Sequence, residues 1–222
     1  MDNNFKELYS DKYFKDRFSG QDKKREESYT QEYTRILEYI DGGKVLDIGC
    51  GMGNFLHVFN ENWDKYGIEI SDFAAQEATK AGIKMINYGD YEEYFDLIIF
   101  RGVVQHLDTP LLNIQQAIKM LKPNAYMVFL ATPNSNSIYY KLFGTLPMLD
   151  KSRNFMIPSD IMMEDSLTNL GMNVENISYP YIGTPYCNYF SDHLKFIGKC
   201  LGLKLKFSFW KNMMEIYARK KV

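Results

Sequence analysis

The feature that most constrains the fold is a short apolar segment that runs directly into a glycine-rich turn, residues 45–53, with the sequence VLDIGCGMG. Residues 45–48 predict a buried strand, and glycine then recurs at every second position. Glycine is used where the backbone takes a positive φ or approaches a ligand closely. The segment therefore predicts a ligand-binding turn at the carboxyl end of a strand. A dinucleotide-binding fingerprint has the different spacing G-x-G-x-x-G.

Further apolar segments follow this turn and alternate with segments of helical character. Strands are expected over residues 65–71, 84–87, 95–100 and 126–130, helices over 73–78 and 110–121, and a turn over 122–125. The segment 95–100 is apolar enough to be buried on both faces, as strands of parallel sheets are. Strands and helices that alternate at this length predict a parallel sheet with right-handed crossovers.

An acidic residue, Glu69, lies at the carboxyl end of the second expected strand, about twenty residues beyond the glycine turn. An acidic side chain at this offset binds ribose hydroxyls in doubly wound folds. A carboxylate suits this task because it accepts two hydrogen bonds from a diol. The pair of strands thus predicts a nucleoside-containing ligand.

The ordered set of Asp47, the glycine turn and Glu69 resembles the class I methyltransferases that use S-adenosylmethionine. The resemblance covers roughly residues 40–135 and, more loosely, residues 159–180 and 213–219. It implies an α/β, Rossmann-like, doubly wound and mostly parallel seven-stranded sheet whose last strand is antiparallel. A departure occurs at Asn124-Ala125, where many relatives carry a glycine pair, and this turn lies away from the ligand.

The same resemblance implies one domain over residues 1–222. Its parts are an N-terminal helical segment (1–43), a cofactor-binding core (44–135) and a region of acceptor-side insertions and C-terminal strands (136–222). Within the N-terminal segment, residues 29–40 have helical apolar spacing. This helix is either a lid over the cofactor, with Tyr9, Tyr13 and Phe14 reaching the site, or a helix packed on the flank of the sheet.

Cofactor-binding residues follow from the resemblance, position by position. The glycine turn would hold the methionine end of S-adenosylmethionine, Glu69 the ribose and Asp90 the adenine amino group. The residues implied to bind the cofactor are Asp47, Gly49, Cys50, Gly51, Phe55, Glu69, Ile70, Asp90, Tyr91, Arg101, Gly102 and Val103. We interpret Cys50 as a small residue that lets the turn close rather than as a nucleophile.

His106 is the candidate catalytic residue. It follows the fourth expected strand, close to where members of the family place the methyl acceptor. An alcohol must lose its proton as the new bond forms, and a positioned histidine can accept that proton. His106 is therefore expected to act either as a base or as a hydrogen-bond partner of the acceptor.

Two tyrosine-rich segments, residues 133–158 and 180–194, are expected to wall the acceptor pocket. Long ordered loops are often binding loops, and in this family such insertions at the carboxyl edge of the sheet build that pocket. The residues implied to bind the acceptor are Asn134, Tyr139, Tyr140, Tyr186, Tyr189, Asp192 and His193. The alternative is that these aromatic residues only seal a small subdomain against the sheet.

Composition narrows the class of protein. The net charge of −2 gives no electrostatic case for nucleic acid, and no stretch approaches the roughly eighteen apolar residues of a membrane span. The three cysteines are scattered without metal-ligand spacing, so no metal is expected, and a reducing cytoplasm fits them. Lysines 195, 199, 204, 206 and 211 could attract an anionic lipid or a sugar nucleotide, a solvated face being the default interpretation.

The acceptor is the least constrained part of the function. Residues 131–137, followed by a tyrosine-rich loop, look like methyltransferases of bacterial surface-polysaccharide and small-metabolite pathways. This similarity favours O-methylation of a sugar, a sugar nucleotide or a glycan substituent such as a phosphoramidate. The alternatives are a quinone-like or other small metabolite, or a catalytically silent partner protein that binds the cofactor. The G-x-G-x-G spacing disfavours a nicotinamide oxidoreductase.

Overall fold

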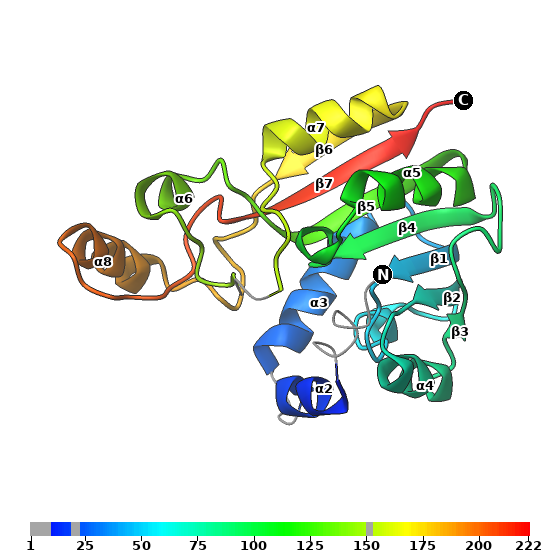
Figure 1. Cartoon of the computed structure of the whole chain (residues 1–222), viewed down its shortest axis with the longest axis horizontal. Helices are drawn as coiled ribbons and strands as arrows, with labels where there is room; N and C mark the ends of the chain where they lie inside the picture. Colours follow the sequence, from blue (N-terminus) through cyan, green and yellow to red (C-terminus); the bar gives the residue numbers. More distant parts are fainter. Residues whose placement is uncertain (1–9, 19–22, 150–152) are drawn as a thin grey trace.

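The computed structural model describes residues 10–18, 23–149 and 153–222. This part of the chain forms a seven-stranded sheet in the order β3-β2-β1-β4-β5-β7-β6 (Figure 1). The strands are β1 (Gly43–Ile48), β2 (Trp63–Ile68), β3 (Lys84–Met85), β4 (Phe95–Arg101), β5 (Leu121–Pro133), β6 (Met172–Ser178) and β7 (Met213–Lys220). Strands β1 to β5 are parallel, and β7 is antiparallel to both β5 and β6. The predicted fold is confirmed, including the antiparallel last strand.

Helices cover both faces of the sheet (Figure 1). The described helices are α2 (Asp11–Phe18), α3 (Lys23–Ile36), α4 (Asp72–Lys80), α5 (Pro110–Met120), α6 (Ile138–Phe143), α7 (Asp160–Asn169) and α8 (Tyr189–Cys200), with short 3-10 turns η1 (Leu56–Val58) and η2 (Val104–His106). Helices α5 and α7 share one buried cluster with the sheet, and α3 and α4 share another. Ser71 caps the N-terminus of α4, because its hydroxyl accepts a hydrogen bond from the Ala74 amide. None of the described helices is long and apolar enough to span a bilayer.

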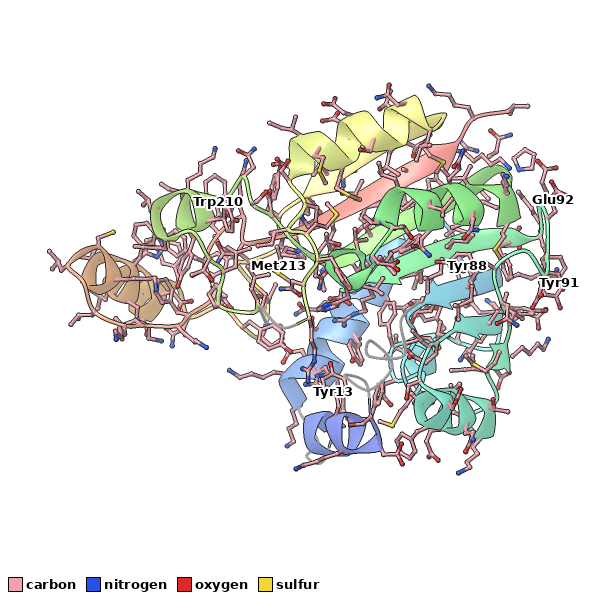
Figure 2. The ribbon with its side chains drawn as sticks, viewed as in Figure 1. Tyr13, Tyr88, Tyr91, Glu92, Trp210 and Met213 are labelled. Atoms are coloured by element: carbon pink, nitrogen blue, oxygen red, sulfur yellow. The ribbon has the colours of Figure 1, made fainter. Side chains whose placement is uncertain are left out.

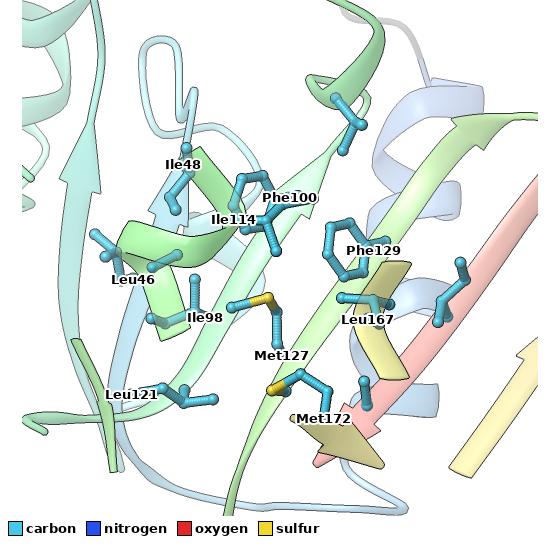
Figure 3. Close-up of a cluster of buried hydrophobic side chains, with 14 of the residues drawn as sticks. Leu46, Ile48, Ile98, Phe100, Ile114, Leu121, Met127, Phe129, Leu167 and Met172 are labelled. Atoms are coloured by element: carbon cyan, nitrogen blue, oxygen red, sulfur yellow. The ribbon is translucent and has the colours of Figure 1, made fainter. Parts of the chain in front are cut away.

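The two-residue period of the strands divides the core between these faces. Leu46 and Ile48 of β1 pack with α5 and α7 (Figure 3), whereas Val45, on the same strand, packs with α3 and α4. Ile98 and Leu97 of β4 separate in the same way. Both faces of the central strands are therefore buried from solvent, which explains their nearly continuous apolar sequence.

The prediction that residues 122–125 form a turn before the fifth strand is wrong, because these residues belong to that strand. Strand β5 begins at Leu121 rather than Tyr126, and these residues bulge out within it. Leu121 pairs with Phe95 and Tyr126 with Leu97, so four residues of β5 face one residue of β4. Asn124 takes a φ of +62°, the conformation for which many relatives use glycine. Strand β5 pairs with β4 both before and after the bulge. The turn-like residues of the bulge could not reveal this pairing, because it depends on a distant strand.

Helix α3 packs on the flank of the sheet, as one of the two interpretations expected. Tyr33 and Ile36 are buried against β1 and η1. The helix also presents residues to a cavity at the carboxyl edge, described below, where Tyr13 and Phe14 lie as well. Tyr9 lies outside the described residues.

A third, smaller cluster lies away from the sheet. It joins α6 and α8 to the segment 205–209, with Tyr139, Leu146 and Phe207 buried at its centre. In Figure 1 this subdomain occupies the end of the molecule opposite β3. The insertions thus have a core of their own, and only part of them can reach the edge of the sheet.

Candidate active site

The glycine turn joins the end of β1 to η1, with Gly49, Gly51 and Gly53 at φ values of +75°, +56° and +82°. L-residues with side chains rarely adopt such angles. A Cβ at Gly49 would lie 2.6 Å from the Val103 side chain, so this position cannot carry one without rearrangement. The backbone at Gly51 has room, with Phe14 of α2 as its nearest neighbour at 3.5 Å from a built Cβ. The turn is shaped to bring backbone close to a ligand.

Asp47 ends β1 beside this turn and is buried. Burial raises the pKa of its carboxyl group to about 8, although the neighbouring Arg101 acts in the opposite direction. Its Oδ1 atom is buried and has no hydrogen-bond partner among the described residues. Such atoms are rare in folded proteins, and a ligand with a hydrogen-bond donor would satisfy this one.

Glu69 connects the end of β2 to the glycine turn. Its Oε2 accepts a hydrogen bond from the Gly51 amide and its Oε1 from the Ser71 amide, both at 2.8 Å. Burial raises the pKa of this carboxyl group, and these amide hydrogen bonds oppose the rise. The two oxygens keep lone pairs for further donors, because an ionised carboxylate has about four acceptor sites.

Two arginine–glutamate pairs attach α3 to the edge of the sheet. Arg101, at the end of β4, donates from Nε to Glu32 at 2.6 Å and from a second nitrogen at 3.1 Å. Arg35 donates twice to Glu215 of β7, at 2.8 and 2.6 Å. The Arg101 guanidinium also lies over the ring of Tyr29, 4.4 Å from its centroid. Bidentate pairs of this kind fix orientation as well as charge, so α3 is held firmly over the carboxyl edge.

His106 lies in η2, directly after β4. Its Nδ1 is 2.8 Å from the Arg153 carbonyl oxygen, which can only accept, so Nδ1 carries the proton. Its Nε2 then carries the ring's lone pair in the plane and accepts a hydrogen bond from the Gln105 side-chain amide at 3.2 Å. The Gln105 amide also donates to the Gly102 carbonyl, which supports this orientation. The geometry leaves Nε2 as the basic nitrogen.

These groups meet in one cavity of about 510 Å³. It runs from the glycine turn past Glu69 and His106 to Tyr181, Tyr186 and Phe209 of the segment before β7. The ligand site therefore lies at the carboxyl edge of the parallel strands, as in other doubly wound folds.

Twelve of the twenty residues singled out from the sequence line this cavity. They are Asp47, Gly49, Cys50, Gly51, Phe55, Glu69, Ile70, Arg101, Gly102, Val103, His106 and Tyr186. The structure thus brings together most of the set implied to bind the cofactor. Cys50 packs against Gly67, where a built Cβ would lie 2.5 Å from its sulfur, in line with a small residue that closes the turn.

Asp90 and Tyr91, expected beside adenine, do not line the cavity. The Asp90 side chain is exposed and accepts a hydrogen bond from the Asn87 amide at 2.7 Å. Tyr91 stacks on Tyr94, and in Figure 2 it lies beside Glu92 at the edge of the molecule, away from Tyr13. Tyr91 also makes edge-on ring contacts with Tyr66 and Phe95, so it packs on the core of the sheet instead of reaching the cavity.

The acceptor residues expected in the first tyrosine-rich segment also lie elsewhere. Tyr139 and Tyr140 belong to the small subdomain core. Asn134 is fully buried, with its side chain bonded to the amide and carboxylate of Asp160. These contacts favour the alternative that this segment seals the subdomain.

In the second tyrosine-rich segment the outcome is divided. Tyr186 lines the cavity, whereas Tyr189 and His193 are exposed on α8. Asp192 is buried beneath α8, where it accepts a hydrogen bond from the Tyr181 hydroxyl at 2.9 Å. It therefore holds Tyr181, which does line the cavity, rather than lining it directly.

Several cavity residues were not anticipated from the sequence. Glu32 and Arg35 come from α3, Tyr88 from the loop after β3, and Asn113 from α5. Asn212 is 1% exposed, and neither polar atom of its side chain has a partner among the described residues. No pattern in the sequence marks Asn212, although Tyr88 stands only two residues before the Asp90 that was singled out.

Residues 22–178 match the family described as "Methyltransferase domain". The chain belongs to the S-adenosylmethionine-dependent methyltransferase family. The resemblance found in the glycine turn and in Glu69 is thereby confirmed. Solved structures of the same fold include a possible histamine N-methyltransferase from Thermotoga maritima, 16% identical with a TM-score of 0.63 over 95% of this chain and 99% of that one. Another, a methyltransferase from Archaeoglobus fulgidus, is 18% identical with a TM-score of 0.64 over 94% of this chain and 98% of that one.

Curated relatives of the methyltransferase match a smaller part of the chain. An uncharacterised protein of Methanocaldococcus jannaschii is 32% identical over 42% of this chain and 47% of its own length. A ubiquinone biosynthesis O-methyltransferase of a Shewanella species is 29% identical over 57% of this chain and 65% of its own length. The chain thus spans about half to two-thirds of the relatives it matches.

The residues of the cavity fit the family's cofactor. The unpartnered Asp47 oxygen suits the amino group of its methionine end, and the open backbone at Gly51 allows close approach. Glu69 would offer lone pairs to the ribose, and Ile70, Leu107 and Tyr88, which line the same cavity, would supply apolar surface for adenine. S-adenosylmethionine is therefore the ligand that this arrangement can hold.

Removing the Glu69 carboxylate is expected to weaken cofactor binding. We expect Glu69→Ala to raise the dissociation constant for S-adenosylhomocysteine at least about tenfold, because hydrogen bonds to charged groups contribute about 1.5–3 kcal/mol. Isothermal titration calorimetry measures this change. Asp90→Ala is the matched control, since that carboxylate is exposed outside the cavity, and it should change the constant less than about twofold. An equal loss of affinity in both variants would support the original assignment of Asp90 to the adenine. An unchanged affinity in Glu69→Ala would show that Glu69 does not bind the ribose.

Proposed function

We propose that this chain transfers a methyl group from S-adenosylmethionine to a hydroxyl oxygen of a polar acceptor, with His106 as the base. The observation that carries the proposal is the tautomer of His106, whose Nδ1 donates to the Arg153 carbonyl while Nε2, the basic nitrogen, accepts a hydrogen bond from the Gln105 side-chain amide beside the cavity. An acceptor hydroxyl would replace the Gln105 amide as the hydrogen-bond donor to Nε2.

When bound, S-adenosylmethionine supplies an activated methyl group on a good leaving group. The protein's own contribution is then mainly alignment, which can contribute roughly 7–11 kcal/mol. His106 accepts the hydroxyl proton at Nε2 as the carbon–oxygen bond forms, and the Arg153 carbonyl stabilises the resulting imidazolium through Nδ1–H. Helix α3, attached through Arg101–Glu32 and Arg35–Glu215, covers the site and limits access of water.

The acceptor end of the cavity supports a sugar or a sugar-like acceptor. The charged groups there are already paired, as with Arg35 and Glu215. Neutral groups therefore remain for recognition: Thr184, Ser208 and the Asn212 carboxamide, beside the aromatic rings of Tyr186 and Phe209. A carboxamide that both donates and accepts suits a vicinal diol, and aromatic faces pack on sugar rings. A sugar, a sugar nucleotide or a glycan substituent of a polysaccharide pathway fits this set.

A second candidate acceptor is a quinone-like metabolite. It is favoured by the similarity to ubiquinone biosynthesis O-methyltransferases and by the aromatic side chains of the cavity. The same base and the same alignment would serve a phenolic hydroxyl. A silent cofactor-binding partner is the remaining alternative, and His106 in its basic tautomer favours an enzyme instead.

The proposal is tested by turnover of S-adenosylmethionine labelled in its methyl group. We expect label to enter a hydroxyl of one or more members of a panel of sugars, nucleotide sugars and glycan fragments, with catechols and hydroquinones as the second panel. The methylated atom is identified by mass spectrometry and NMR. Labelling of amines alone would contradict the O-methyltransferase proposal, and binding of cofactor without any turnover would favour the silent partner.

A further inference from the structure

Helix α8 presents an apolar stripe to the outside of the molecule. Phe190, Leu194, Ile197 and Leu201 are each between 57% and 81% exposed. Their spacing of four, three and four residues places them on one face of the helix. Single exposed apolar residues are ordinary, but a continuous stripe of large ones marks an interaction surface.

The opposite face of α8 is anchored, so the stripe is a fixed feature of the fold. Phe196 stacks on Phe209 with ring centroids 4.5 Å apart, and Asp192 is buried against Tyr181. Figure 1 shows α8 at the end of the molecule furthest from β3, with its outer side turned away from the sheet. The stripe therefore cannot be covered by the sheet core.

An adjoining residue enlarges the apolar surface. Leu203 is more than half exposed, and its amide donates a hydrogen bond to the Gly198 carbonyl of α8. We define the α8 face as Leu203 together with the four residues of the stripe. Phenylalanine and leucine on one side of an amphipathic helix are typical of helices that lie in a bilayer interface.

The charge of this region is opposite in sign to that of the whole chain. Residues 189–211 contain five lysines and one carboxylate, whereas the chain carries a net charge of −2. The carboxylate, Asp192, is buried and accepts hydrogen bonds from Tyr181 and Asn188. Lys204 and Lys206 are exposed beside the end of α8. This charge is complementary to an anionic lipid surface.

We propose that the α8 face docks on an anionic bilayer surface. A second copy of the chain is the weaker candidate, because a twofold interface formed by this face would bring together two regions of the same positive charge. Basic residues near an anionic leaflet contribute attraction while the apolar stripe enters the boundary between headgroups and acyl chains. The helix lies on the membrane and does not cross it.

Docking in this way has a consequence for the acceptor, which rests on the proposed function. Tyr181, Tyr186 and Phe209 belong to the same insertion between β6 and β7 as α8 and line the cavity. Tyr186 is also 43% exposed, so it lies where the cavity meets the surface. Docking of α8 on a bilayer would place this opening next to the membrane surface, where an acceptor attached to a lipid could enter it.

Co-sedimentation of the full chain with vesicles tests the proposal without any acceptor. We expect binding to phosphatidylcholine vesicles rich in phosphatidylglycerol, weaker binding in high salt, and little binding to pure phosphatidylcholine. Phe190→Ser with Leu194→Ser should lower the partition coefficient at least about thirtyfold. Lys204→Gln with Lys206→Gln should lower it roughly thirtyfold, at about 1 kcal/mol for each lysine.

Leu111→Ser with Leu112→Ser is the matched control, because these leucines of α5 are also more than half exposed but lie outside the α8 face. This control should bind vesicles like the unaltered chain, and every variant should keep its affinity for S-adenosylhomocysteine. The proposal is overturned by absence of binding to anionic vesicles in low salt, or by equal losses in the α5 and α8 variants. A dimer that dissociates on Phe190→Ser with Leu194→Ser, in a chain that ignores vesicles, would assign the face to a second copy.

Discussion

Replacing His106 by alanine should lower kcat for methyl transfer by about 10²–10⁴-fold and leave the affinity for S-adenosylhomocysteine unchanged. The loss is expected because Nε2 is the basic nitrogen of a histidine whose other nitrogen is held by the Arg153 carbonyl. Steady-state kinetics with the acceptor found in the labelled-methyl panel measures kcat and KM, and calorimetry measures cofactor affinity. His106→Asn keeps a hydrogen-bonding side chain but cannot take the proton, so it should be nearly as slow as alanine.

His193→Ala provides the matched control. That histidine also directs Nδ1 to a backbone carbonyl, of Tyr189 at 2.7 Å, but it is exposed and outside the cavity lining. It should retain near-normal turnover. Full activity in His106→Ala would remove His106 as the base, and recovery of activity in His106→Asn alone would reduce its role to orientation of the acceptor.

Breaking the pair between Glu32 and Arg101 should produce the largest loss of stability. Glu32→Ala leaves the Arg101 guanidinium without its bidentate partner beside the buried end of β4, where Glu32 is 5% and Arg101 20% exposed. We expect the free energy of unfolding to fall by about 3 kcal/mol, the low end of the range for buried pairs because Arg101 keeps some contact with water. The melting temperature should fall by roughly 6–12 °C in calorimetry.

The exposed pair Glu77–Lys80 of α4 has the same 2.6 Å separation and serves as the control. Glu77→Ala should change stability by less than about 0.5 kcal/mol, since solvent screens that pair. The double variant Glu32→Ala with Arg101→Met should recover part of the loss, because it removes the uncompensated charge. Equal effects in Glu32→Ala and Glu77→Ala would show that α3 is not held by its ion pair.

Residues close together in the chain were predicted well. Asp47 and the glycine turn act through backbone angles and through the end of a single strand, so their arrangement is local. Glu69 meets this turn because parallel neighbours β1 and β2 end at the same edge of the sheet. The Ser71 cap and the apolar pattern of β4 are local for the same reason.

The acceptor side was predicted less well, because tyrosine serves equally in a pocket and in a core. Tyr139 and Tyr186 both lie in tyrosine-rich segments of the sequence. One is buried in the subdomain and the other lines the cavity, according to how α6 and α8 pack on each other. Asp90 shows the same limit at shorter range, since a two-residue strand leaves the direction of its loop to tertiary contacts.

The sequence by itself determined the alternation of strands and helices and the edge where a ligand binds, because these depend on apolar patterns and on a glycine turn. Its resemblance to the class I methyltransferases supplied the seven-stranded sheet and the cofactor. The tertiary structure alone decided which polar groups are left for the acceptor. Glu32 and Arg35 form ion pairs with Arg101 and Glu215, which lie 69 and 180 residues further along the chain. Asn212 keeps both polar atoms unpaired among the described residues. Whether a buried polar group is satisfied depends on partners that folding brings from distant segments, and no local pattern records it.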